Sequence, residues 1–375
     1  MITKAYFNYK KLGDYLALAI IFVFLTQTFF RLYPFTEITP GISNGIDDWF
    51  RYWNNAKDIT HVGFWMPSQS EVYYGPGSFL YNYFIAGCFL LFGERVAPIY
   101  FIQSLLLALS ILFIYYTFRR QLSGLTSILF LLTLFAFALL DVYKYYTFKL
   151  LSENLGIFTL SVFVYFAKIA FDKTKMGFHF IAIFFLLLSV LTRPTLFPLI
   201  FAYILFLFFY FYENPKFKKV NLFGMLAILL VGMSGLAFRN YYVVGVWEFL
   251  PSEGISDSWK QLLSLDFSII YKKILFSLGF LPQLNSDYNL RPHWFILALL
   301  YSFYLFHRLR NIKTITYSEF LFNGFIIGFY VLTILFVTVD SYGFRAFLPI
   351  QFLLIAISFL TFDKVLRLFL KEDIL

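Results

Sequence analysis

Two adjacent carboxylates, Asp47 and Asp48, are the first residues whose type and spacing could support chemistry. The residues that follow place five apolar side chains on one face of a helix: Trp49, Tyr52, Trp53, Ala56 and Ile59. One Asp suffices to cap a helix, and a second carboxylate beside it is repelled unless a cation or a function compensates. The pair is therefore either a helix cap or a catalytic pair, and the sequence leaves both interpretations open.

Two further carboxylates lie at the ends of apolar segments. Asp141 ends one segment, and Glu153 lies at the start of the next. An acid in the first turn of a helix complements the helix dipole, but a carboxylate within a membrane is a functional candidate by default. Asp141 and Glu153 are thus candidates for a supporting acid or a metal ligand, since carboxylate oxygens suit Mg²⁺, Mn²⁺ or Ca²⁺. The four histidines are far apart, so the sequence indicates no zinc site.

Three arginines, Arg193, Arg239 and Arg345, also lie at the ends of apolar segments. Each could extend its guanidinium toward lipid headgroups. Three that converge at one membrane surface instead favour a shared anion, and the guanidinium fork matches a phosphate. We expect them to form a phosphate-binding group.

The composition places these residues in a membrane protein. Of 375 residues, 60% are hydrophobic and 14% are charged, whereas about 25% are charged in soluble domains. The net charge of +9 does not indicate nucleic-acid binding, because most basic residues flank apolar stretches. The single cysteine, Cys88, excludes an intramolecular disulfide. The motifs GxxxxGKS/T, GxGxxG and GxSxG do not occur in the sequence, so ATP hydrolysis, dinucleotide chemistry and serine hydrolysis lack their usual signatures.

Apolar segments long enough, or nearly long enough, to cross about 30 Å of hydrocarbon predict an all-α polytopic protein of about ten transmembrane helices. These segments are 15–32, 97–118, 124–141, 150–170, 178–192, 195–212, 221–238, 293–307, 317–338 and 346–361. The segments 78–92 and 267–281 are short or interrupted by lysines, and we expect both to be interfacial or re-entrant helices.

The distribution of basic residues predicts the orientation of the chain. With ten spans, more than half of the 30 Lys and Arg fall in six short segments on one side: 1–12, 118–123, 168–177, 213–220, 307–316 and 362–375. The positive-inside rule makes this side, with both termini, cytoplasmic. The chain is then one transmembrane domain, 1–375, of the plasma (inner) membrane, with outer loops at about 33–96 and 239–292 and no soluble C-terminal domain. Chemistry is expected on the outer face.

Six short motifs, in order over about 15–360, resemble the GT-C glycosyltransferases, which include the protein O-mannosyltransferases and the lipid A aminoarabinose transferase. The spacing of Asp48 to Tyr52 and Ala56 is similar to their Asp-Glu-x-x-Tyr-x-x-x-Ala stretch, although Trp49 stands where the family has Glu, so Asp47 and Asp48 both stay candidates. The other five similar motifs are Tyr74-Gly75-Pro76-Gly77 with Leu91-Phe92-Gly93, Ser152-Glu153, Thr192-Arg193-Pro194, Arg239-Asn240-Tyr241-Tyr242 with Gly245, and Phe344-Arg345-Ala346-Phe347-Leu348-Pro349.

The resemblance implies a GT-C-like helical bundle and an inverting transfer of a sugar from a polyprenyl-phosphate carrier to a hydroxyl acceptor, which could be lipid, glycan or protein. It implies that Asp48 or Asp47 is the general base and that arginines bind the carrier phosphate. It also implies a membrane enzyme that takes part in building the cell envelope. The alternatives are a polysaccharide polymerase or ligase, a flippase of lipid-linked sugars, and a solute transporter. A flippase should carry ionisable residues through the bilayer centre, and a transporter should show an inverted repeat.

The predicted orientation can be tested with topology reporters. A reporter fused after Arg120 or Lys219 should report the cytoplasm, and one fused near Ser258 should report the outer side. If Arg120 is found outside, the segment 78–92 crosses the membrane and the expected side of the chemistry is wrong.

Overall fold

The structure is a computed structural model, and its helices run through most of the chain. It describes residues 9–32, 48–63, 79–140, 147–213, 219–245, 247, 268, 271, 280–282, 288–290, 292–310, 320, 322–324, 326–328, 331 and 348–369. The helices are α1 (Tyr9–Leu32), α2 (Asp48–His61), α3 (Phe79–Phe92), α4 (Val96–Phe118), α5 (Gly124–Ala138), α7 (Glu153–Lys173), α8 (Met176–Thr192), α9 (Pro198–Glu213), α10 (Lys219–Val244), α13 (Pro292–Arg310) and α16 (Leu348–Phe369), with 3-10 turns η1 (Arg119–Gln121) and η2 (Pro194–Leu196).

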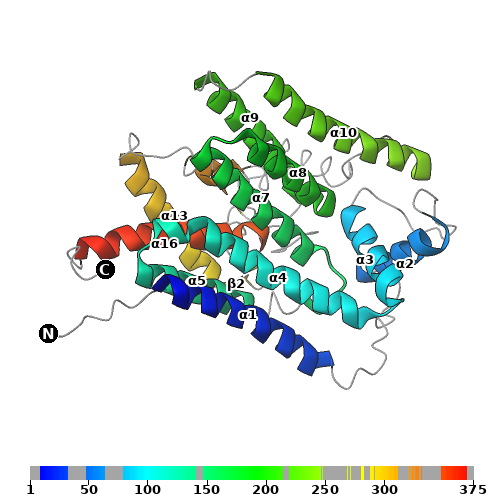
Figure 1. Ribbon diagram of the computed structural model, residues 1–375, viewed down its shortest axis with the longest axis horizontal. Coiled ribbons are helices and arrows are strands. Elements are labelled where there is room, and N and C mark those ends of the chain that lie inside the picture. Colours follow the sequence, from blue (N-terminus) through cyan, green and yellow to red (C-terminus); the bar gives the residue numbers. More distant parts are fainter. Residues whose placement is uncertain are drawn as a thin grey trace.

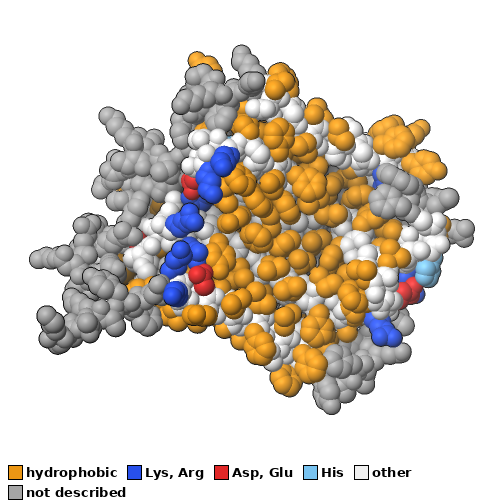
Figure 2. All heavy atoms as spheres, viewed as in Figure 1, with side chains coloured by type: hydrophobic (Ala, Val, Ile, Leu, Met, Phe, Trp, Pro, Cys, Tyr) orange, Lys and Arg blue, Asp and Glu red, His pale blue; other side chains and the backbone are white. Residues whose placement is uncertain are grey.

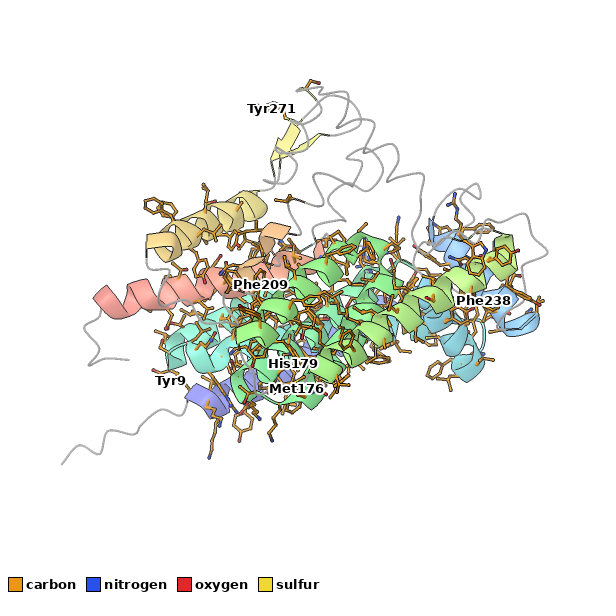
Figure 3. The ribbon with its side chains drawn as sticks, turned by 90° about the horizontal axis from the view of Figure 1, so that it is seen from above. Tyr9, Met176, His179, Phe209, Phe238 and Tyr271 are labelled. Carbon is orange, nitrogen blue, oxygen red and sulfur yellow. The ribbon has the colours of Figure 1, made fainter. Side chains whose placement is uncertain are left out.

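Each predicted span overlaps one of these helices, with ends that differ by a few residues, apart from 317–338, most of which lies outside the described residues. Five described helical stretches are long and apolar enough to cross a membrane: Tyr9–Leu32, Val96–Gln121, Glu153–Lys173, Pro194–Tyr212 and Val220–Tyr242. Shorter apolar helices accompany them at Phe79–Phe92, Gly124–Ala138, Met176–Thr192, Ile296–Phe306 and Leu348–Asp363. The all-α prediction is confirmed for the described part, with one addition: β1 (Phe280–Pro282) pairs antiparallel with β2 (Tyr288–Leu290). Figure 3 shows this hairpin beside Tyr271, to one side of the bundle. The rest of the predicted interfacial segment 267–281 lies outside the described residues.

The surface of the bundle separates apolar and charged side chains. Figure 2 shows a broad hydrophobic face with a row of Lys and Arg along one end of it. Exposed basic residues at the start of α1, the end of α4 and the turn after α7 include Lys10, Lys11, Arg120, Lys173 and Lys175. A membrane imposes this pattern, because charged side chains are costly in hydrocarbon.

Helix α7 is the most enclosed of the five stretches that are long and apolar enough to cross a membrane. In its most apolar window 78% of the residues are buried, against 28% for α1 and 22% for α10. It packs against α4 and α8, and Figure 1 shows it between them in the bundle. Because lipid is as apolar as these side chains, such helices are held together by close packing and polar contacts rather than by exclusion of water.

Helices α2 and α3 pack on each other at the end of the bundle away from the start of α1 (Figure 1). The apolar stripe predicted for α2 is confirmed as a packing face, and its partner is α3: Trp53 packs edge-on against Phe89, with ring centroids 4.6 Å apart. Glu94, in the turn after α3, binds Lys57 and His61 near the end of α2, each at 2.8 Å. Helix α3 has 14 residues and is about 21 Å long, so it is too short to cross about 30 Å of hydrocarbon. This length is consistent with the interfacial helix predicted for 78–92.

Candidate active site

The hairpin of α7 and α8 brings Glu153 and Arg193 together. Glu153 is the first residue of α7, and Arg193 follows the last residue of α8. The two helices are joined by a two-residue turn in which Thr174 adopts a left-handed conformation, so the start of one helix lies beside the end of the other. Pro194 holds Arg193 in an extended backbone (φ −139°, ψ 102°) and ends α8 there.

Glu153 and Arg193 form a buried ion pair. The Nη1 atom of Arg193 lies 2.7 Å from the Oε1 atom of Glu153, and the side chains are 4% and 0% exposed. Such a pair costs much desolvation free energy to form, but removing one partner costs about 3–5 kcal/mol because a buried charge is left behind. The side chains therefore hold each other in place at the end of α7.

Gly156 makes room for this contact. It lies one turn after Glu153, and a Cβ atom built on it would lie 2.9 Å from Cδ and 3.1 Å from Cγ of Arg193. The stem of Arg193 thus crosses α7 directly over Gly156, in space that any other residue would occupy.

A polar network surrounds the start of α7. The hydroxyl of Tyr81 on α3 donates to Oε1 of Gln103 at 2.5 Å, and the Gln103 amide donates to the carbonyls of Thr147 and Lys149 at 2.8 and 2.9 Å. Asn154, next to Glu153, donates to Oγ1 of Thr147 at 2.9 Å. Burial raises the pKa of Tyr81 well above its usual range, and the charge of Glu153 raises it further, so the hydroxyl stays protonated and remains a donor. The network fixes α3 to α4 and α7 close to Glu153.

Arg239 lies near the end of α10, on another side of α3. It is 4% exposed, donates from Nη1 to Oδ1 of Asn240 at 2.9 Å, and lies 5.4 Å from the ring centre of Phe79. Burial raises the pKa of Tyr83, and its hydrogen bond with Arg239 opposes that shift. Figure 3 shows the neighbouring Phe238 at the end of the bundle where α2 and α3 lie.

The predicted base lies at the start of α2. The helix begins at Asp48, of which the structure describes the backbone. One turn later, Tyr52 packs edge-on against Tyr81, with ring centroids 5.0 Å apart. Through Tyr81, the start of α2 is placed next to the network around Glu153.

The structure thus gathers four of the predicted residues at one end of the bundle: Asp48 by its backbone, and Glu153, Arg193 and Arg239 by their side chains. Asp47, Asp141 and Arg345 lie outside the described residues. Sequence reasoning did not identify Tyr81, Tyr83, Gln103 or Gly156. Tyr81 and Gln103 lie in apolar helices and resemble ordinary core residues there, whereas Gly156, three residues after Glu153, could have been noticed as a small residue on the same helix face.

The described residues offer cations and hydrogen-bond donors more than metal ligands. Within them, no group of three or more His, Cys, Asp or Glu could hold a metal ion. Glu153 does not fit a metal ligand in this arrangement, because its carboxylate faces a guanidinium. The arrangement suits an anion brought to the arginines and a reacting group brought to the start of α2.

Gly156→Ala tests the packing of Arg193 over α7. The added methyl group should push Arg193 away from Glu153 and lower the free energy of unfolding by ~1–3 kcal/mol, measured by thermal unfolding of the purified protein in detergent. Gly235→Ala in α10 is the matched control, since nothing lies within 4 Å of its Cβ position and Ala is the better helix former. Equal stability of the two variants would contradict the geometry of the pair.

The chain is similar to known proteins in part of its sequence and in its fold. Residues 76–237 match the family model of dolichyl-phosphate-mannose-protein mannosyltransferases, a range that includes α3, Glu153 and Arg193. No curated protein sequence matches the chain significantly.

Two crystal structures of an oligosaccharyltransferase of Archaeoglobus fulgidus share the fold. The apo form has a TM-score of 0.57 at 14% identity and covers 96% of this chain and 52% of its own. The form tethered by a disulfide bond to an acceptor peptide containing the NVT sequon has a TM-score of 0.56 at 14% identity, covering 95% of this chain and 50% of its own. The chain therefore spans about half the length of these structures, and at this identity the likeness shows the fold. Family model and fold agree, and the resemblance of this chain to the GT-C superfamily of integral membrane glycosyltransferases is confirmed.

Proposed function

We propose that this protein is an inverting glycosyltransferase that moves a sugar from a polyprenyl-phosphate carrier to a hydroxyl acceptor, which is a lipid, a glycan or a protein. One observation carries the proposal: a buried Glu153–Arg193 pair and the buried Arg239 flank the short helix α3, at the end of the bundle where α2 begins with Asp48. The family match over 76–237 supports the same chemistry. The site faces the outer side of the plasma membrane, and the basic end with both termini faces the cytoplasm.

Asp48 is the general base in this proposal. A hydroxyl group is a poor nucleophile, so a carboxylate must accept its proton as the hydroxyl attacks the sugar. The helix dipole at the start of α2 favours the ionised carboxylate there. Asp47, the preceding residue, is the alternative base or a supporting group.

The arginines stabilise the departing lipid phosphate. Charge builds up on the phosphate as the bond to the sugar breaks, and fixed cations stabilise that charge more than an acid could. Arg239 is held by Asn240 and Phe79, and its charge acts on the neighbouring Tyr83, whose pKa it lowers against the effect of burial. We assign Arg193 and Arg345 to the same phosphate, with Arg193 positioned by Glu153.

A bound divalent cation would be held by carboxylates other than Glu153. Glu153 serves as the supporting acid that positions Arg193, so Asp47, Asp48 and Asp141 are the remaining carboxylates that could hold Mg²⁺, Mn²⁺ or Ca²⁺. No step of the proposed reaction is routed through a metal.

Asp48→Asn tests the base. The amide keeps the size of the side chain and its ability to cap a helix but cannot accept the proton, so transfer should fall by about 10²–10⁴-fold while donor binding is retained. The assay uses purified protein with a panel of polyprenyl-phosphate sugars and measures transferred sugar. Asp47→Asn is the matched control and should be milder. The reverse order would assign the base to Asp47, and full activity of both variants would place the base elsewhere.

Arg239→Ala tests the phosphate contact. Loss of a charge-assisted hydrogen bond should weaken donor use by ~1.5–3 kcal/mol, roughly ten- to a hundredfold in kcat/KM for the donor. Arg120→Ala, an exposed arginine at the opposite, basic end, should leave these kinetics unchanged. Wild-type donor kinetics in a folded Arg239→Ala variant would show that Arg239 has a structural role only.

A further inference from the structure

We propose that the outer part of α1 binds an anionic phospholipid of the surrounding bilayer. A groove with a volume of about 410 Å³ lies between α1 and the segment before α7. Its lining residues are Phe22, Val23, Thr26, Gln27, Phe30, Arg31 and Phe148. This volume is within the range of small-molecule sites, about 300–1,000 Å³.

The lining residues form a strip on one face of α1. Phe22, Thr26 and Phe30 recur every four residues, so they lie above one another along the helix. The opposite face is packed on the bundle: Ala17, Ile20, Phe24 and Thr28 are buried, and Thr28 donates to Ser104 on α4 at 2.8 Å. The side chains of Phe22 and Phe30 are 70% and 71% exposed, so the strip faces the hydrocarbon of the membrane.

The strip changes from apolar to cationic along the helix. It begins with Phe22 and Val23, continues with the polar Thr26 and Gln27, and ends with Phe30 and the cationic Arg31 in the last turn of α1. From Phe22 to Arg31 the helix rises about 13–14 Å, close to half of the ~30 Å hydrocarbon thickness. An amphiphile of one leaflet, with an acyl chain against the aromatic wall and an anionic phosphate at Arg31, matches both the length and the charge of this strip.

Arg31 is positioned to bind that phosphate. Its guanidinium carbon lies 4.1 Å from the ring centre of Phe148, a cation–π contact that orients the plane of the group. Among the ion pairs of the described residues, none involves Arg31. A guanidinium held against a ring still has N–H groups that can bind phosphate oxygens with two hydrogen bonds.

The groove is connected to the polar network near Glu153. Phe148 lies between Thr147 and Lys149, whose carbonyls accept the hydrogen bonds of Gln103. Phe148 also packs edge-on against Tyr100 of α4, at 5.8 Å between ring centroids. A lipid that presses on Phe148 therefore steadies the segment that holds Gln103.

Native mass spectrometry of the full-length protein in detergent tests the proposal directly. The protein is titrated with phosphatidylglycerol and, separately, with phosphatidylcholine of the same acyl chains. Wild type should bind one phosphatidylglycerol about tenfold or more tightly than any phosphatidylcholine, and Arg31→Gln should abolish that preference. Arg95→Gln is the matched control: Arg95 is an exposed arginine after α3 that does not line the groove, and its loss should leave the preference intact.

A second variant separates the groove from the charge. Val23→Trp fills the groove, keeps Arg31, and should remove the tight lipid by excluding its acyl chain. An unchanged preference in Arg31→Gln or in Val23→Trp overturns the proposal. Displacement of the bound phosphatidylglycerol by a polyprenyl phosphate at equal concentration would also overturn the proposal. The groove would then be a binding site for the polyprenyl-phosphate carrier. The measurement counts bound lipid without any turnover, so its failure leaves the proposed transfer reaction to its own tests.

Discussion

The buried ion pair of Glu153 and Arg193 is the interaction on which the end of the bundle depends. It joins the start of α7, the most enclosed of the five span-length stretches, to the end of α8. Because both charges are removed from water, neither residue can change alone without leaving the other unpaired at a high cost in free energy. The positions of Gly156 and Pro194 follow from this pair: one leaves space for the stem of Arg193, and the other ends α8 so that the stem can turn toward α7.

The membrane explains why these charges are at helix ends. In hydrocarbon an ionised group is costly, so the long helices carry apolar side chains over most of their length and place charges at both ends (Figure 2). At the basic end Lys and Arg are exposed to water. At the other end Glu153, Arg193 and Arg239 are buried. Exposed charges can be explained by orientation in the membrane, whereas buried ones require a partner within the protein or a ligand.

Much of the fold could be predicted from the sequence, because the length and charge of a membrane span are strongly constrained. The positions of the described helices, the apolar stripe of α2 and the short α3 could be predicted, but the exact helix ends could not: α1 begins at Tyr9 and α16 ends at Phe369, several residues beyond the predicted spans. The candidate residues Glu153, Arg193 and Arg239 were identified because charge is conspicuous in an apolar sequence. The pairing of Glu153 with Arg193 was not predicted, since it requires the register between α7 and α8. Tyr81 and Gln103 were missed for a related reason: a buried hydroxyl or amide in a helix gives no sequence signal until its partner, far away in the chain, is known.

The short helix α3 explains how one end of a bundle can combine residues from several helices. Tyr81 and Tyr83 are two positions apart, which on a helix places them about 200° from each other. One side of α3 therefore reaches Gln103 on α4 and the start of α7, and the other reaches Arg239 on α10. A helix that spans the membrane crosses its neighbours at modest angles, about 20–40°. Because α3 is too short to span the membrane, it can lie at the ends of the long helices. The contact of Tyr81 on α3 with Tyr52 positions α2, and with it Asp48, at the same end of the bundle.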